Sequence, residues 1–100
     1  MNSRQYWIVI ERGPRNCSAY SPDVPGCAAT GASVEKTLAR MRRALRLHLG
    51  GMIEDGDPLP RPHTLSWHIR HSDDFAPAVD DLITQVEVEL PGPGCISAAA

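Results

Sequence analysis

Apolar residues recur through the middle of the chain at steps of three and four positions, the spacing that places side chains on one face of an α-helix. A serine suited to the N-cap, Ser33, stands before this stripe, and residues 55–58 (Asp-Gly-Asp-Pro) end it. The pattern therefore predicts a long amphipathic helix over residues 33–53 whose apolar face packs in the core. The residues of the stripe are Val34, Leu38, Met41, Leu45, Leu49 and Met52.

Strand patterns flank the predicted helix. Residues 6–11 are β-branched and aromatic on both alternating faces, which predicts an interior strand covered on both sides. Residues 17–20 and 27–30 predict two further short strands, and residues 84–90 alternate strictly between apolar and polar side chains, as a half-exposed strand does. The sequence thus predicts an α+β fold in which an antiparallel sheet of three to four strands, in β-β-β-α-β order, carries the helix on one face.

Composition limits the chain to a small globular protein. It has 100 residues, 42% of them hydrophobic and 22% charged, and no apolar run approaches the length of a membrane-spanning helix. We expect one domain over residues 1–92 and a flexible tail at 93–100. The three cysteines, Cys17, Cys27 and Cys95, show no CxxC spacing, which argues against a disulfide framework and favours a reducing cytoplasm.

Charge is divided unevenly along the sequence. Residues 1–53 carry a net charge of +5 and residues 54–100 carry −7. An acidic half can steer a basic partner toward the protein, although solvated acidic loops would give the same pattern. The candidate partner-binding residues are Asp73, Asp74, Asp80, Asp81, Glu87 and Glu89.

Candidate catalytic and metal-binding residues are few. The predicted element order is similar to part of the ribonuclease H architecture, but Glu11, Asp23 and Glu87 do not form the converging carboxylates that a metal-dependent nuclease needs. Thr64 would cap a short helix over residues 65–71, where His68 and His71 lie three positions apart without a third ligand. We therefore expect no catalytic residue, no metal and no cofactor, with both histidines partly exposed beside Trp67.

Two further side chains have plain structural interpretations. Asp23 is expected to accept hydrogen bonds from turn amides, and His48 is expected to lie half-buried at the edge of the helix stripe. A cluster of arginines on the same helix wraps around it rather than lining one edge, which favours a solvated face over a DNA-binding surface. The cluster comprises Arg40, Arg42, Arg43 and Arg46.

Residues 21–27 read Ser-Pro-Asp-Val-Pro-Gly-Cys, and two prolines with a glycine specify a rigid corner between two strands. With the helix end, Pro58-Leu59-Pro60 and the closing run 86–92, this corner resembles the N-terminal domain of HicB-family antitoxins, which has a partial ribonuclease-H-like fold. The resemblance covers about nine tenths of the chain. It marks the signature corner as Pro22, Asp23, Pro25, Gly26, Cys27 and Gly31.

The resemblance implies a non-catalytic antitoxin that binds a small, basic, RNA-cleaving toxin of the HicA type and masks its active site. Many family members also carry a C-terminal DNA-binding module, for which the sequence after residue 92 leaves no room, so direct DNA binding is not expected. The alternative is an orphan ligand-binding or regulatory module without a toxin.

Assembly is the remaining expectation. Leu47 points away from the helix stripe, and the last strand would present an unpaired edge of the kind that proteins commonly cover by association. We therefore expect a homodimer or a larger oligomer, with Leu47, Val86 and Val88 as contact residues.

Overall fold

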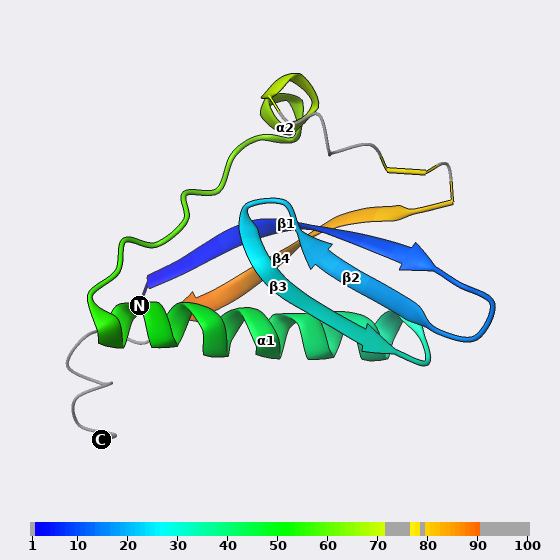
Figure 1. Cartoon of the computed structure of the whole chain (residues 1–100), viewed down its shortest axis with the longest axis horizontal. Helices are drawn as coiled ribbons and strands as arrows, with labels where there is room; N and C mark the ends of the chain where they lie inside the picture. The colour runs from blue at the N-terminus through cyan, green and yellow to red at the C-terminus, as the bar shows by residue number, and fades with distance from the viewer. Residues whose placement is uncertain (1, 72–76, 79, 91–100) are drawn as a thin grey trace.

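The computed structural model describes residues 2–71, 77–78 and 80–90 of the chain. One antiparallel sheet of four strands, in the order β3-β2-β1-β4, lies against a long helix (Figure 1). This arrangement confirms the predicted α+β fold and its β-β-β-α-β order. The elements are β1 (Asn2–Arg12), β2 (Cys17–Ser21), β3 (Val24–Gly31), α1 (Val34–Asp55), α2 (Leu65–His71) and β4 (Leu82–Leu90).

The first strand, β1, is central because it pairs on one side with β2 and on the other with β4. On the β4 side the pairing covers most of the strand, and the register runs from Asn2 opposite Leu90 to Ile10 opposite Leu82. The two edges of the sheet are β3 and β4. The first and last described strands of the chain therefore pair directly, with β1 inside the sheet and β4 at its edge.

The core lies between α1 and the covered face of the sheet. Met41, Leu45 and Leu49 of the predicted stripe are completely buried, and they pack with alternate residues of β1 such as Ile8 and Ile10. Val9 points to the opposite face by alternation and is also completely buried. The centre of β1 is thus covered on both sides, as its sequence predicts.

Local signals at both ends of α1 act as expected. The Ser33 side chain accepts a hydrogen bond from the backbone N–H of Lys36. At the other end Gly56 adopts φ 75°, a left-handed conformation, and its N–H donates to the carbonyl of Ile53. The helix consequently extends to Asp55, two residues beyond the predicted end.

The proline corner is a two-residue turn at Pro22 and Asp23 between β2 and β3. The strand β3 begins at Val24, three residues earlier than predicted, so Pro25 and Gly26 belong to the strand. Proline is tolerated there because β3 is an edge strand, and Gly26 takes a φ of 84°. The register shifts between Tyr20 and Ser21, which bends the strand into the turn.

After α1, residues 57–71, here named the return segment, run back along the molecule and end in the short helix α2 (Figure 1). The predicted helix over residues 65–71 is confirmed, and Thr64 accepts a hydrogen bond from the backbone N–H of Trp67 as an N-cap does. Neither helix of the described chain is long and apolar enough to cross a membrane.

Candidate partner-binding surface and a buried aspartate–histidine cluster

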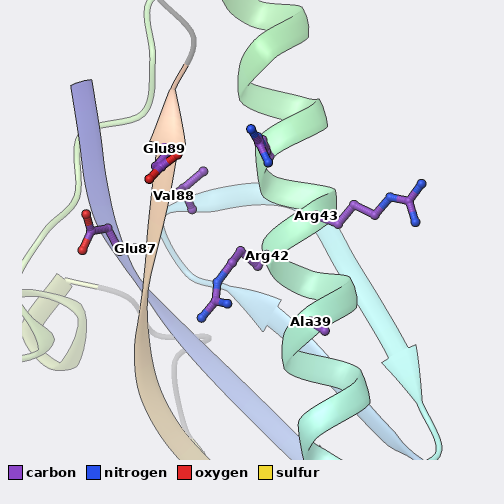
Figure 2. A pocket seen from close by; sticks show the side chains of 7 residues that line it. Ala39, Arg42, Arg43, Glu87, Val88 and Glu89 are labelled. Carbon is purple, nitrogen blue, oxygen red and sulfur yellow. The ribbon is translucent and has the colours of Figure 1, made fainter. Parts of the chain in front are cut away.

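A groove of about 670 Å³ runs between α1 and the edge strand β4 (Figure 2). It brings the basic first half of the sequence beside the acidic second half, so the two charge signs meet in space. Its lining residues are Ala39, Arg42, Arg43 and Arg46 from α1 with Glu87, Val88 and Glu89 from β4.

The charged side chains of this groove are not locked to one another. Arg42 reaches from α1 toward β4, whereas Glu87 points away from the helix (Figure 2). Within the described part of the chain, the ion pairs within 4.0 Å both involve Asp23, which lies elsewhere. The groove therefore presents cations and anions that remain free for a partner.

The predicted acidic residues occupy several environments. Glu87 and Glu89 are exposed on the outer row of β4. Asp80 is exposed and its carbonyl accepts from the Arg12 guanidinium, while the Asp81 carboxylate, half-buried, accepts from the backbone N–H of Ala78 at 2.8 Å. Asp73 and Asp74 lie outside the described residues. The structure thus places four of the six residues, and two of them border the groove.

The residues predicted as oligomer contacts differ in exposure. Leu47 is 70% exposed on α1, four positions after Arg43 on the flank that borders the groove. Val86 and Val88 are buried, at 3% and 1%, because their phase on β4 points them under α1 into the core. Their side chains consequently cannot be surface contacts, and only the backbone edge of β4 and Leu47 remain available for that role.

A second site lies at the proline corner, where Asp23 is buried with two histidines. One carboxylate oxygen, Oδ1, lies 3.0 Å from His63 Nδ1 and 2.8 Å from His68 Nε2. The same oxygen accepts the backbone N–H of His63 at 3.1 Å. The other oxygen, Oδ2, is buried and has no hydrogen-bond partner among the described residues. Asp23 therefore connects the β2–β3 turn to the return segment.

Aromatic rings enclose this cluster on the side of α2. The indole of Trp67 stacks on His63, with ring centroids 3.7 Å apart, and on His71, with centroids 4.7 Å apart. It also meets the His68 ring edge-on at 5.2 Å. The stacking fixes the orientation of the His63 ring, whose side chain remains 35% exposed.

The structure corrects several interpretations of these polar residues. Asp23 bonds to residues 40 and 45 positions away instead of to its own turn amides, and His68, predicted to be partly exposed beside Trp67, contacts Trp67 but is buried with Asp23. His48 is exposed and not half-buried, since its position on α1 faces away from the sheet. No local sequence pattern predicts the cluster of Asp23, His63 and His68, because Asp23 and the two histidines come from segments that are distant in sequence and meet only in the folded protein.

The signature residues Cys27 and Gly31, and Cys17 beside Cys27, have structural roles. Cys17 and Cys27 are buried free thiols on the neighbouring strands β2 and β3, and burial raises the pKa of the Cys27 thiol. Gly31 lies against the first turn of α1, where an added Cβ would approach the backbone nitrogen of Thr37 to 2.8 Å. These residues hold the helix close to the sheet.

The chain folds as a small α+β domain with a charged groove between α1 and β4. The profile of the HicB-like antitoxins of bacterial toxin-antitoxin systems matches residues 6–92. The chain therefore belongs to the HicB-like antitoxin family, as the signature corner indicates.

A phage protein is similar to most of the chain. An uncharacterized 14.9 kDa protein from the rep-hol intergenic region of Haemophilus phage HP1 is 29% identical over 85 residues, which are 85% of this chain and 61% of the phage protein. The chain thus spans about three fifths of that relative's length.

Solved structures show the same fold. The N-terminal domain of antitoxin HicB from Burkholderia pseudomallei superposes with a TM-score of 0.70 at 18% identity, covering 87% of this chain and all of that domain. A chain of the HicA3 and HicB3 toxin-antitoxin complex superposes with a TM-score of 0.58 at 22% identity, covering 89% of this chain and 100% of that chain.

Proposed function

We propose that this protein is a non-catalytic antitoxin that binds a small HicA-type, RNA-cleaving toxin and masks its active site. The observation that carries the proposal is membership of the HicB-like antitoxin family over residues 6–92. The solved HicA3 and HicB3 complex, which has a chain with this fold, supports a toxin of that kind as the partner.

The surface chemistry suits a cationic partner. A protein that cleaves RNA must carry positive charge around the phosphates that it handles. The exposed carboxylates of Asp80, Glu87 and Glu89 offer negative charge at one end and one edge of the sheet. Charges of this kind act over about 8 Å at physiological salt, so they accelerate encounter more than they tighten the final complex.

The arginines of the groove limit which part of the toxin surface can lie opposite α1. Arg42, Arg43 and Arg46 would repel a uniformly basic surface, so the toxin must place its own acidic or neutral residues opposite α1. Electrostatic recognition then fixes the orientation of the toxin as well as its rate of approach. In this arrangement the exposed outer row of β4, with Glu87 and Glu89, faces the basic part of the toxin, whereas the backbone edge of β4 stays available for a second copy.

We also propose that the protein works as a homodimer or larger oligomer in the cytoplasm. The free edge of β4 and the exposed Leu47 lie on neighbouring surfaces, and a second copy pairing with that edge would cover both. Buried free thiols at Cys17 and Cys27 suit a reducing compartment. Light scattering that shows a monomer at tens of micromolar would contradict the proposed oligomer but would not bear on the antitoxin role.

The deciding experiment begins with the neighbouring reading frames of the gene. A short, basic frame with a double-stranded-RNA-binding pattern is expected, and its expression alone should arrest growth. Co-expression of the present protein should restore growth, and the two proteins should purify together. Arrest that this protein does not relieve would overturn the proposal, and the absence of any such frame would favour the orphan-module alternative.

Kinetics on the purified pair test the steering role of the acids. Replacing Asp73, Asp74, Asp80 and Asp81 together by Asn should lower the association rate about tenfold at low salt and flatten its salt dependence. Dissociation should change less, because packing controls it. The matched control is Glu35→Gln with Glu54→Gln, two exposed acids on α1. An unchanged association rate in the fourfold variant would refute the steering role of these acids and would leave the antitoxin proposal standing.

A further inference from the structure

We propose that Asp23, His63 and His68 bind a divalent transition-metal ion, for which Zn²⁺ is the best match. The proposal concerns the proline corner and the return segment, and it does not depend on a toxin. It departs from the sequence-based expectation that the chain binds no metal. Two imidazole nitrogens and one carboxylate oxygen form a donor set that zinc accepts.

The donor atoms lie close to the spacing of a metal site. One donor atom from each residue lies within 4.8 Å of the other two. Two atoms bonded to one zinc ion at about 2.0–2.2 Å are about 3.3–3.5 Å apart in tetrahedral geometry. The Asp23 Oδ1 distances of 3.0 Å to His63 and 2.8 Å to His68 need to lengthen by only a few tenths of an ångström.

The unpartnered oxygen of Asp23 is the second, independent observation. Oδ1 lies within hydrogen-bond distance of three nitrogen atoms, whereas the buried Oδ2 has no partner among the described residues. A buried carboxylate oxygen without a partner is costly, and native structures usually satisfy such atoms. A cation beside this carboxylate would neutralise its charge and use the vacant lone pairs of Oδ2.

The proposed metal site is closed to solvent at Asp23 and His68 and open to solvent at His63. The side chains of Asp23 and His68 are 0% and 3% exposed, whereas that of His63 is 35% exposed. An ion can therefore enter beside His63, and three protein ligands leave one position for water. Once bound, the ion would clip the return segment to the β2–β3 turn, so metal would stabilise α2 against local opening.

The test is a Zn²⁺ titration of the full chain, followed by calorimetry and by tryptophan fluorescence in a Trp7→Phe background, where the emission comes from Trp67, which contacts both histidines. Cys95→Ser is the parent protein, because that thiol could otherwise take the metal. One equivalent of Zn²⁺ should bind and change the indole emission, and Co²⁺ should bind with the visible absorption of a tetrahedral site. His63→Gln and His68→Gln should each weaken binding by about tenfold or more.

His71→Gln is the matched control, because His71 lies on the same helix and stacks on the same indole but is not a member of the cluster. It should bind Zn²⁺ with the affinity of the parent. His63→Gln alters a half-exposed side chain, so circular dichroism will show an intact fold even if His68→Gln unfolds the protein. Absence of one-equivalent binding in the parent would overturn the proposal, as would equal weakening in His71→Gln and His63→Gln.

Discussion

Two parts of this molecule are stabilised by different interactions: the sheet with α1, and the return segment with the sheet. The sheet and α1 share an apolar core in which Leu45 and its stripe are completely buried. The return segment packs Leu59 against the core, and polar contacts join the rest of it to the sheet, namely the Asp23 cluster and the bonds that Tyr6 and Arg4 donate to the carbonyl of Pro60. Apolar burial is insensitive to direction, whereas each polar contact requires one geometry. The return segment should therefore open locally while the core stays folded.

The largest effect should come from Leu45→Asp, which places a charge in the apolar core. The cost of an unpaired buried charge should exceed about 4 kcal/mol and leave the protein largely unfolded. Far-ultraviolet circular dichroism and urea denaturation measure this. The control is Leu47→Asp, two positions away and 70% exposed, which should unfold close to the parent. Equal stability of the two variants would show that α1 does not pack as described.

Gly31→Ala should lower stability by about 1–3 kcal/mol, because the new methyl group would overlap the first turn of α1. The added Cβ would lie 2.7 Å from Thr37 Oγ1, which is itself fixed by its bond to the carbonyl of Ser33. Gly51→Ala is the opposite case, since its Cβ meets nothing and α1 gains a better helix former. It should raise stability by about 0.5–1 kcal/mol in the same urea titration, and a change of the same sign in both variants would refute this reasoning.

Asp23→Asn should show most clearly that the return segment opens independently of the core formed by the sheet and α1. In buffer with a chelator, loss of the charged acceptor should weaken the anchor of α2 by about 1–2 kcal/mol. Hydrogen exchange of the His68 amide, which donates to the carbonyl of Thr64, should accelerate about tenfold, while that of Leu45 should stay slow. Asp57→Asn, an exposed change of the same chemistry, serves as the control. Equal acceleration at both amides would mean that the regions unfold as one unit.

The smallest effect should come from Tyr6→Phe, which removes the 2.8 Å bond to Pro60 at a cost of about 1 kcal/mol. Burial raises the pKa of Tyr6 above its ordinary value of 10.0, so the folded state holds this proton more tightly than the unfolded state. Its contribution is therefore complete below pH 10 and is lost as the pH rises above that value.

Urea titrations at pH 8 and above pH 10 measure this contribution. The stability of the parent should fall at alkaline pH, and that of Tyr6→Phe should fall less. Tyr20→Phe is the control, because burial also raises the pKa of Tyr20 but its hydroxyl makes no hydrogen bond within the described residues. It should leave stability at pH 8 nearly unchanged. Identical pH curves for the parent and Tyr6→Phe would contradict the assignment.

Prediction from sequence succeeded where local patterns carry the information. The spacing of the apolar stripe, the Ser33 cap and the alternation of residues 84–90 each describe neighbours along the chain, and the structure confirms all three. The Asp23 cluster could not be predicted in this way, because its bonds cross 40 and 45 positions and no periodicity relates them. Val86 and Val88, predicted as oligomer contacts, are buried in the core. Alternation correctly places both side chains on one face of β4, but it does not show whether that face packs in the core or against another copy.

The pairing of β1 with β4 has a consequence for synthesis on the ribosome. The strand made first must wait for the last described strand, since Asn2 pairs with Leu90 and Ile10 with Leu82. At about 5–20 residues per second, translation of the intervening chain takes several seconds. During that time one edge of β1 has no partner and can be recognised by proteases or by other nascent chains. The time needed to finish the sheet therefore sets a minimum delay between translation and a protected, mature antitoxin domain.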